Sequence, residues 1–475
     1  MDKPTTSSQA QKNPQSRLSC VVEEEHAPLY AARQALRRHA TGGNILILAT
    51  IAALIVANIP GLNNYYFKFW EEPCIVQIGS FNIFSHGGHP MTVLEVINDA
   101  LMAIFFFSIG LEIKREVLVG ELSSFRQALL PIMGAIGGMA IPVLIYFCLS
   151  SGTPYAGGAA IPMATDIAFS LGVLALLGSR VPIGLKIFLT TLAVVDDIGG
   201  IVVIAVFYST HIEFALLGIA AIILGVLLLG SKLHIKSKIF YIGLGGVVWL
   251  LFLNSGIHPT IAGVLVAFCV PATPVFQPVK YIRSIRHAIS KFSREDEEAL
   301  CRRSILSHDQ LDWLKEVESA SDKVISPLQD LEDSLHPIVN NFIVPLFAFA
   351  NAGIFLLDIA PASIFEGVSL AIICGLVFGK FLGILLFSWA TVKLRMAPMP
   401  KGADWKMMTS ISMLGGIGFT VSIFIANLSF GGGDSMNADI LNHAKLGIVV
   451  GSVLSGVLAF LMLRHFLPKT PQPEE

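Results

Sequence analysis

The feature that most limits the fold of this chain is a series of apolar segments, most of them long enough to cross a membrane. Lipid offers the backbone no hydrogen bonds, so such segments must be helical, and about 20 apolar residues cross a hydrocarbon core about 30 Å thick. With 54% hydrophobic and only 14% charged residues, the chain is predicted to be an all-α polytopic membrane protein with about twelve transmembrane helices. The segments are 44–60, 93–118, 125–150, 156–178, 183–209, 212–230, 238–254, 258–271, 337–357, 365–391, 407–430 and 440–465.

Basic residues predict how these helices are oriented. Arg37 and Arg38 precede the first segment, clusters of Lys and Arg follow every second segment, and the opposite loops carry almost none except Lys68. Because cytoplasmic loops are enriched in Lys and Arg, this pattern predicts that both termini are cytoplasmic. The clusters are Lys114, Arg115 and Arg126; Arg180 and Lys186; Lys232, Lys236 and Lys238; Lys280, Arg283 and Arg286; Lys393, Arg395 and Lys401; and Arg464 with Lys469.

The same pattern predicts the domain organisation. Residues 1–43 form a cytosolic polar tail without the apolar core of a signal peptide. Residues 44–271 carry helices 1 to 8, with 61–92 as an outside hairpin or loop. A charged cytosolic loop, expected to form solvated helices, covers 272–336, helices 9 to 12 cover 337–465, and 466–475 is a cytosolic tail.

Two adjacent aspartates, Asp196 and Asp197, lie deep in an apolar segment. They stand about ten residues from Lys186, which is about 15 Å along a helix. A carboxylate at that depth costs about 3 kcal/mol, so the pair predicts an ion or proton site. Neighbouring side chains point about 100° apart on a helix, so one aspartate can face a cavity while the other meets a partner, for which Lys380 is the obvious candidate.

Two segments are interrupted by glycine or proline at bilayer depth. Gly157, Gly158 and Pro162 precede Thr165 and Asp166, and a second run contains Gly415, Gly416 and Gly418. Unwound backbone survives in a membrane only where it lines a cavity or is covered by protein. Because the breaks fall in helices 4 and 11, we expect an inverted repeat of helices 3 to 5 and 10 to 12 with two crossing broken helices. Asp166 and Lys380 are expected to neutralise the half-helix ends.

Several motifs then occur in the order typical of one transporter family. They are NDALMAIFFFSIGLEIKRE, ATDIAFSLGVLALLGSRVP, LAVVDDIGG, SGIHPTIAGV, PLFAFANAG and GGIGFTVSIF. Over residues 44–465 the chain resembles the NhaA-type sodium/proton antiporters, which are themselves a standard example of inverted repeats, so the repeat argument above is not independent. The N-terminal tail and the expanded charged loop depart from the family pattern.

The resemblance implies a role for each candidate residue. Asp196 and Asp197 form the Na⁺ and proton site, Thr165 and Asp166 lie where the broken helices cross, and Lys380 balances charge. An ion funnel and pH-sensing cluster is implied at Glu112, Glu116 and Glu332, and His258 is tied to the pH profile. The resemblance further implies electrogenic export of Na⁺, with Li⁺ as a second substrate, by a homodimer in the lipid of a bacterial inner membrane, without a cofactor.

Other interpretations of these residues stay open. Asp196 and Asp197 could serve only as structural hydrogen-bonding groups, Asp166 as a helix cap and Lys380 as a salt-bridge partner. His258 could cap or pack a helix start, and Asp99, a further intramembrane acid, could join two helices by a hydrogen bond. Glu112 and Glu116 flank Lys114 and Arg115, which is also typical of an interfacial ion-pair cluster.

Three rival functions make different demands on the same residues. An intramembrane aspartyl protease requires a Tyr-Asp motif, which the chain lacks, and its only Gly-Gly-Gly-Asp run, 431–434, falls in a predicted outside loop. A passive channel does not need clustered acids with one lysine. An ion-coupled symporter of a small organic solute is the remaining alternative, although the residues beside the aspartates are small and aliphatic. The formal net charge of −2 gives no indication of nucleic-acid binding. Neither disulfides nor a structural metal site are expected, because the six cysteines form no CxxC pair.

Overall fold

The computed structural model describes residues 42–79, 81–86, 89–209, 212–272, 278–291, 307–355, 361–431 and 435–468. Most of both predicted tails and residues 432–434 of the Gly-Gly-Gly-Asp run lie outside these ranges. Contacts divide the chain into two compact units. The membrane unit comprises Thr41–Thr273 and Ser326–Glu475, and the charged unit comprises Met1–Ala40 and Pro274–Ile325.

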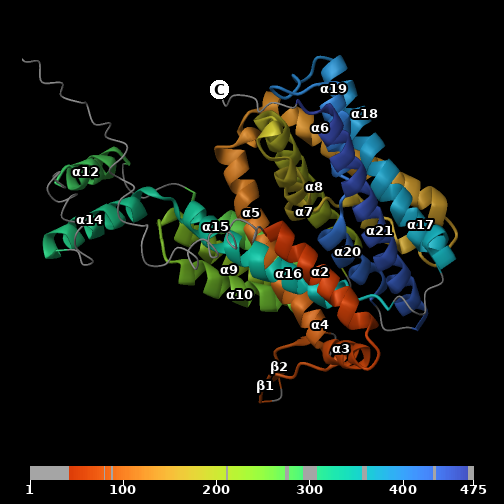
Figure 1. The fold of residues 1–475 in the computed structure, drawn as a ribbon. Coiled ribbons are helices and arrows are strands. Elements are labelled where there is room, and N and C mark those ends of the chain that lie inside the picture. Colours follow the sequence, from red (N-terminus) through yellow and green to blue (C-terminus); the bar gives the residue numbers. More distant parts are fainter. Residues whose placement is uncertain are drawn as a thin grey trace, which may run out of the picture. The chain divides into compact units, whose positions relative to one another are not determined.

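The membrane unit is built of apolar helices (Figure 1). Among the described residues, seven spans are long and apolar enough to cross a membrane, or up to nine if two bent helix pairs count as spans. The chain is therefore a helical multi-pass membrane protein, while the number twelve and the inverted repeat stay predictions. The seven spans are Val93–Leu118, Phe125–Ser150, Ala156–Leu177, Ile183–Phe207, Phe214–Lys232, Gly367–Lys393 and Met436–Phe466, and the bent pairs are Gly43–Asn58 with Leu62–Glu71 and Trp405–Leu414 with Phe419–Phe430.

Several spans combine more than one type of helix. The first contains α4 (Val93–Val96), the π-helical turn η2 (Ile97–Leu101) and α5 (Met102–Leu118). The next are α6 (Phe125–Ser150), then η4 (Ala156–Gly158), η5 (Ile161–Met163) and α7 (Ile167–Leu177), followed by α8 (Ile183–Phe207) and α9 (Phe214–Lys232). Later come α17 (Gly367–Cys374), the π-helical η10 (Gly375–Gly379), α18 (Lys380–Lys393), α19 (Trp405–Leu414), α20 (Phe419–Phe430) and α21 (Ser435–Phe466).

Shorter elements complete the membrane unit. They are α2 (Gly42–Asn58), α3 (Leu62–Glu71), α10 (Lys238–Leu253), α11 (Thr260–Cys269), α15 (Pro327–Ile338), the π-helical η7 (Val339–Ile343), α16 (Val344–Asn351) and the 3₁₀ turns η3 (Glu121–Ser123), η6 (Gly178–Arg180) and η9 (Pro361–Phe365).

The segment predicted as a hairpin or loop at 61–92 also contains a helix. Helix α3 follows α2 at a bend of 112°, made at Gly61, whose φ of 87° favours glycine. Tyr66 and Trp70 are buried on α3, four residues apart and therefore on one helix face. Two short antiparallel ladders follow, β1 (Gln77–Ile78) with β2 (Phe81–Asn82) and β3 (Ser85–His86) with β4 (His89–Pro90).

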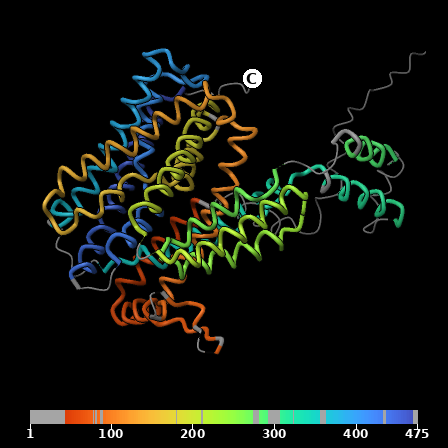
Figure 2. The backbone as a smooth tube through the Cα atoms, turned by 180° about the vertical axis from the view of Figure 1, so that it is seen from behind, coloured from red at the N-terminus to blue at the C-terminus, as the bar shows by residue number. Residues whose placement is uncertain are grey.

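Glycines let α6 and α18 approach closely, and the two helices run side by side in the view from behind (Figure 2). A Cβ added at Gly137 would strike the backbone of Gly383, and one added at Gly383 would strike Gly137. Small residues at a helix contact are typical of membrane proteins. The close contact holds the N-terminus of α18, which begins at Lys380, against α6.

The described residues of the charged unit include two helices in the stretch where solvated helices were expected. They are α12 (Pro278–Ser290) and α14 (His308–Val324), which pack against each other. Ser284 Oγ donates to Glu316 Oε1 at 3.1 Å, and Lys291 Nζ lies 3.8 Å from the other oxygen of Glu316.

Candidate functional site

Two interrupted helices meet beside α8. Between η5 and α7 the chain is not helical at residues 164–166, and α19 and α20 are separated at 415–418 with a bend of 42°. The interruptions touch, because the Asp166 amide donates to the Ile417 carbonyl at 2.7 Å. Both predicted breaks are therefore present and in contact.

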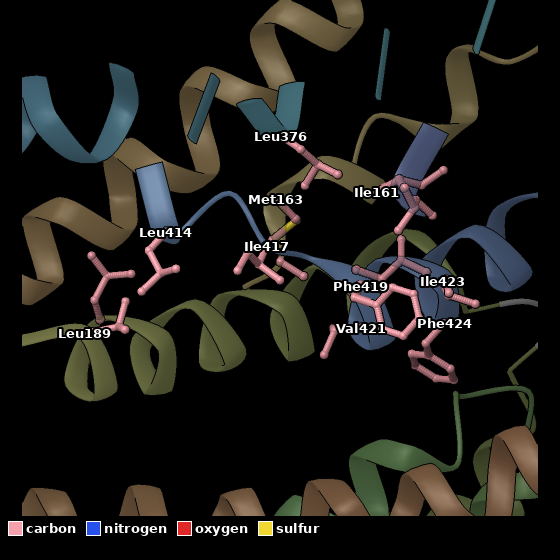
Figure 3. Close-up of a cluster of buried hydrophobic side chains, with 14 of the residues drawn as sticks. Ile161, Met163, Leu189, Leu376, Leu414, Ile417, Phe419, Val421, Ile423 and Phe424 are labelled. Carbon is pink, nitrogen blue, oxygen red and sulfur yellow. The ribbon is translucent and has the colours of Figure 1, made fainter. Parts of the chain in front are cut away.

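The glycines that predicted the second break are required by close packing. A Cβ on Gly418 would lie 2.9 Å from Leu376 Cδ2 and 3.0 Å from the Ala164 carbonyl, and one on Gly416 would lie 2.6 Å from Ser455 Oγ. Figure 3 shows Met163, Leu376 and Ile417 gathered where the two segments meet. The unwound backbone is thus covered by protein on its apolar side, as a membrane interior requires.

Asp166 lies at the start of two half-helices. Its Oδ1 accepts from the Phe169 amide at 3.0 Å and so caps α7. Its Oδ2 accepts from the Thr420 amide at 3.1 Å and from the Thr420 hydroxyl at 2.6 Å, at the start of α20. A carboxylate at a helix N-terminus is stabilised by the free amides and the helix dipole. Asp166 thus accepts hydrogen bonds at the starts of both half-helices from a position on one of the broken helices themselves, whereas neutralisation from nearby helices was expected.

Asp196 is held by a buried ion pair. Lys380 Nζ contacts Asp196 Oδ2, and both side chains are inaccessible to solvent. Lys380 follows directly after the π-helical turn η10, a type of irregularity that is frequent at functional sites. The partnership expected for Lys380 is thus with Asp196, and it joins α8 to α18.

Thr165 connects this pair to the broken helices. Its Oγ1 accepts from Lys380 Nζ at 2.9 Å, and it lies 2.6 Å from Asp196 Oδ2 and 3.0 Å from the Gly415 carbonyl. A hydroxyl has one proton to donate. It can give that proton to an ionised Asp196, or to Gly415 while a protonated Asp196 donates to it. The same geometry therefore accommodates both protonation states of Asp196.

Asp197 has a different environment from its neighbour. It is buried, with 3% of its surface exposed, and no hydrogen bond to its carboxylate is found among the described residues. The charged groups that act on it are Asp196, Glu112, Asp166 and Lys380. A buried carboxylate without a described partner needs a neutralising charge, so Asp197 is suited to hold a cation or a proton.

Glu112, Glu116 and Glu332 gather around Arg115. Arg115 pairs with Glu116 at 3.1 Å and with Glu332 of α15 at 3.4 Å, while Glu116 Oε2 accepts from the Glu121 amide at 3.1 Å. Burial raises the pKa of Glu332, the Arg115 guanidinium partly offsets that rise, and the charge of Glu112 adds to it. Glu112 lies one helical turn before Arg115 on α5.

His258 and Asp99 form a second titratable pair. His258 Nε2 lies 3.6 Å from Asp99 Oδ1, and its Nδ1 lies 2.8 Å from Thr260 Oγ1. The imidazole also packs edge to face against Phe424 of α20, with ring centroids 5.4 Å apart. The structure thus places His258 between α11, η2 and a half-helix, whereas Lys380 and Asp196 join α18 to α8.

Sequence reasoning missed a chain of buried amides. Asn351 Nδ2 donates to Asn98 Oδ1 at 2.7 Å, and Asn427 Nδ2 donates to Asn351 Oδ1 at 2.7 Å. These bonds join η2, α16 and the half-helix α20. One indication of this chain of amides was present in the sequence, namely an asparagine in each of three apolar segments, including the FAFANAG run. Asparagine side chains in membrane helices form interhelical hydrogen bonds that stabilise packing.

Replacing Asn351 by Ala is expected to lower the free energy of unfolding. Asn351 is fully buried, and its loss leaves two amide groups without a partner, at about 1–3 kcal/mol for each group. The measurement is denaturant unfolding in mixed micelles, with Asn64→Ala at an exposed position as the matched control. Equal stability of the two variants would contradict a structural role of the amide chain.

A second buried lysine was also overlooked. The sequence argument counted only Lys380 inside the membrane, but Lys445 lies in the candidate span Met436–Phe466 and is 7% exposed. Lys445 lies near the start of the predicted segment 440–465, where a lysine side chain can extend to the membrane interface. Its position in the sequence therefore did not indicate that it is buried. The correction is that at least two lysines, not one, are buried in the apolar spans that the structure describes.

Comparison with known proteins gives consistent matches. Residues 33–463 match the sequence model of the family described as "Na+/H+ antiporter 1". A protein of Phocaeicola vulgatus named "Na(+)/H(+) antiporter NhaA" is 53% identical over 445 residues, which cover 94% of this chain and 98% of that protein. One of the same name from Bacteroides thetaiotaomicron is 52% identical, covering 89% of this chain and 94% of its own. "Na(+)/H(+) antiporter NhaA 2" of Syntrophotalea carbinolica is 42% identical, covering 90% and 94%.

Proposed function

Because this chain belongs to the Na+/H+ antiporter 1 family, as its motifs predicted, we propose that it exchanges Na⁺ for H⁺ across a membrane. The family consists of transporters and not of enzymes. The observation that carries the proposal is the difference in surroundings between the two neighbouring acids Asp196 and Asp197. Asp196 is paired with Lys380, whereas the carboxylate of Asp197 is buried and has neither an ion-pair partner nor a hydrogen-bond partner among the described residues.

Exchange follows from competition for these carboxylates. Na⁺ is a hard cation and prefers oxygen ligands, as carboxylates, hydroxyls and carbonyls provide. In the proposed cycle Asp197 carries either Na⁺ or a proton, because both neutralise the same buried charge. Thr165 and the Gly415 carbonyl are further oxygens near Asp196. If the site opens to each side in turn, loading with one ion on one side and the other ion on the opposite side produces antiport.

We assign electrogenic exchange to the coupling of Asp197 with the Asp196–Lys380 pair. When Na⁺ enters, it adds positive charge beside Lys380, so the pair rearranges and releases a further proton. More protons than sodium ions then move per cycle. Because the three groups are coupled, individual titration steps belong to the cluster and not to one residue.

Alternating access is assigned to the broken helices. Asp166 bonds to the starts of both α7 and α20, so these half-helices are joined at the site and can move as one body. The non-helical segments 164–166 and 415–418 supply backbone that can adjust without breaking helical hydrogen bonds. Motion of this body relative to η2 and α16 requires the bond between Asn427 and Asn351 to shift.

We assign pH regulation and the entry of ions to the cluster around Arg115. A carboxyl group with a raised pKa changes charge over a higher pH range than an exposed one, and burial raises the pKa of Glu332. Ionisation of Glu332 strengthens its pairing with Arg115 and leaves Glu112 to attract cations toward Asp197. His258 and Asp99 are proposed as a second titratable pair, which reaches α20 through the contact of His258 with Phe424.

The remaining parts of the proposal rest on the family and on charge distribution. They are Li⁺ as a second substrate, a homodimer in membrane lipid, the inner membrane of a bacterium, and both termini on the cytoplasmic side. Symport of an organic solute is not favoured, because the residues beside Asp196 and Asp197 are small and aliphatic.

The test is transport by the purified protein in vesicles with an acidic interior. Adding external NaCl or LiCl is expected to raise the internal pH, while KCl is not, and the response is expected to vary with external pH. Clamping the membrane potential with K⁺ and valinomycin is expected to accelerate the response if exchange is electrogenic. The absence of any Na⁺ or Li⁺ response across the tested pH range would overturn the proposed antiport, and an equal rate with and without the clamp would overturn electrogenicity alone.

A further inference from the structure

The two helices of the charged unit differ sharply in charge. Helix α12, PVKYIRSIRHAIS, contains Lys280, Arg283 and Arg286 and no acidic residue. Helix α14, HDQLDWLKEVESASDKV, contains five acidic residues and two lysines. The pair is therefore strongly polarised, with a basic helix packed against an acidic one. Such a distribution gives the helix pair a preferred orientation near a charged surface.

One face of α12 is covered by α14. Ser284 donates to Glu316 at 3.1 Å, and Ala288 is fully buried. These two positions are four residues apart and so lie on one side of the helix. Packing against α14 thus accounts for this side of α12.

The opposite face of α12 has no covering element among the described residues. Ile282 is 48% exposed and Ile289 is 57% exposed, and Arg283 and Arg286 are exposed as well. Ile282, Arg286 and Ile289 follow the spacing i, i+4, i+7, which places them in one stripe along the helix. An exposed stripe of isoleucine and arginine without an acid is typical of a helix that lies in a membrane interface.

The chain itself keeps α12 close to a membrane. The apolar helix α11 ends at Cys269 and α12 begins at Pro278, so the eight intervening residues reach at most about 30 Å. At the other end, α14 stops at Val324 and α15 begins at Pro327. Both ends of the charged unit are thus attached by short segments to the membrane unit, which limits its distance from the lipid surface.

We propose that the exposed face of α12, defined by Ile282, Arg283, Arg286 and Ile289, binds the surface of an anionic phospholipid membrane. The arginines contact lipid phosphates, the isoleucines enter the boundary between headgroups and acyl chains, and the acidic helix α14 faces away from the lipid. Positive side chains near an anionic leaflet are attracted within about one Debye length. This docking does not depend on the direction or even the existence of antiport.

The test uses the full chain in vesicles and compares two labelled positions. A fluorophore is attached to Ser290→Cys, beside Ile289 on α12, or to the matched variant Ser319→Cys, which is exposed on α14, after replacement of the native cysteines. Spin-labelled lipids quench the fluorophore only where it reaches the bilayer. In vesicles containing phosphatidylglycerol, quenching at 290 is expected to exceed that at 319 by at least about twofold, and to fall at about 1 M salt, where the Debye length is about 3 Å.

Charge variants test whether the arginines hold α12 on the lipid. Arg283→Gln with Arg286→Gln is expected to reduce quenching at 290, while Lys315→Gln on the exposed side of α14 is not. Similar quenching at both positions would overturn the proposal. The proposal would also be overturned if quenching at 290 persisted in purely zwitterionic vesicles. The same holds if quenching at 290 changed neither at high salt nor in the arginine variants. Antiport measured in the same vesicles distinguishes failure of docking from failure of the proposed transport function.

Discussion

Replacing Asp197 by Asn is expected to abolish Na⁺-dependent proton exchange while leaving the protein folded. The substitution keeps the size of the side chain and removes its negative charge. Asp197 makes no side-chain hydrogen bond among the described residues, so its loss leaves no described group without a partner. In contrast, the proposed Na⁺ site loses its only carboxylate that is not already paired with a lysine. A loss of about 3 kcal/mol in cation binding corresponds to more than about 100-fold in affinity.

The measurement is the collapse of a pH gradient in vesicles on addition of NaCl, with protein incorporation quantified in each sample. Asp330→Asn is the matched control, because Asp330 is exposed and pairs with Lys238 at 2.7 Å, outside the candidate site. We expect that control to transport like the parent protein. If Asp197→Asn retained Na⁺-dependent exchange at the parent rate, the assignment of Asp197 as the ion-binding carboxylate would be wrong.

Breaking the Asp196–Lys380 pair is expected to cause the largest loss of stability, and removing both charges to restore most of it. Both side chains are inaccessible to solvent. Asp196→Asn leaves an unpaired lysine in the interior, and Lys380→Met leaves an unpaired carboxylate. Removing one partner of a buried pair costs about 3–5 kcal/mol, whereas replacing both by neutral groups is often nearly neutral.

A double-mutant cycle measures this coupling as free energies of unfolding in mixed micelles. The matched cycle is Lys238→Met with Asp330→Asn, the same pair of residue types with side chains 38% and 50% exposed, for which about 0–1 kcal/mol is expected. A coupling energy at Asp196 and Lys380 no larger than that of the surface pair would show that the contact does not hold α8 and α18 together. Transport by the stable double variant then tests separately whether the pair takes part in proton coupling.

Much of the site could be located from the sequence because membrane burial makes charge and glycine expensive. A carboxylate in lipid requires a partner, so Asp196, Asp197, Asp166 and Lys380 stood out from their apolar segments. The breaks at Pro162 and at Gly415 to Gly418 stood out for the same reason, and both are observed. The sequence could not decide which aspartate contacts Lys380. Adjacent residues on a helix point in different directions, but the sequence does not show which helix each side chain contacts.

Other buried polar side chains and the helix irregularities were hard to recognise in the sequence, because only their surroundings in the folded protein show whether they are paired or buried. Asn98, Asn351 and Asn427 are single amides in separate segments, and only the folded protein makes them a hydrogen-bonded chain. Lys445 lies near the start of the predicted segment 440–465, where a long side chain can reach water. The π-helical turns η2, η7 and η10 insert one residue into an otherwise regular helix, a change that leaves no pattern in an apolar sequence.

The sequence by itself determined that this is a helical, multi-pass membrane protein of the antiporter family, because lipid permits only helices for such apolar segments and several specific motifs occur in order. It also determined which charged residues needed an explanation. Only the tertiary structure decided their pairing: Asp196 with Lys380 and Thr165, Asp166 with the starts of α7 and α20, and Asp197 with no described hydrogen-bond partner for its carboxylate. The physical reason is that hydrophobicity is a property of each segment, whereas a buried ion pair depends on the distance between atoms of different helices.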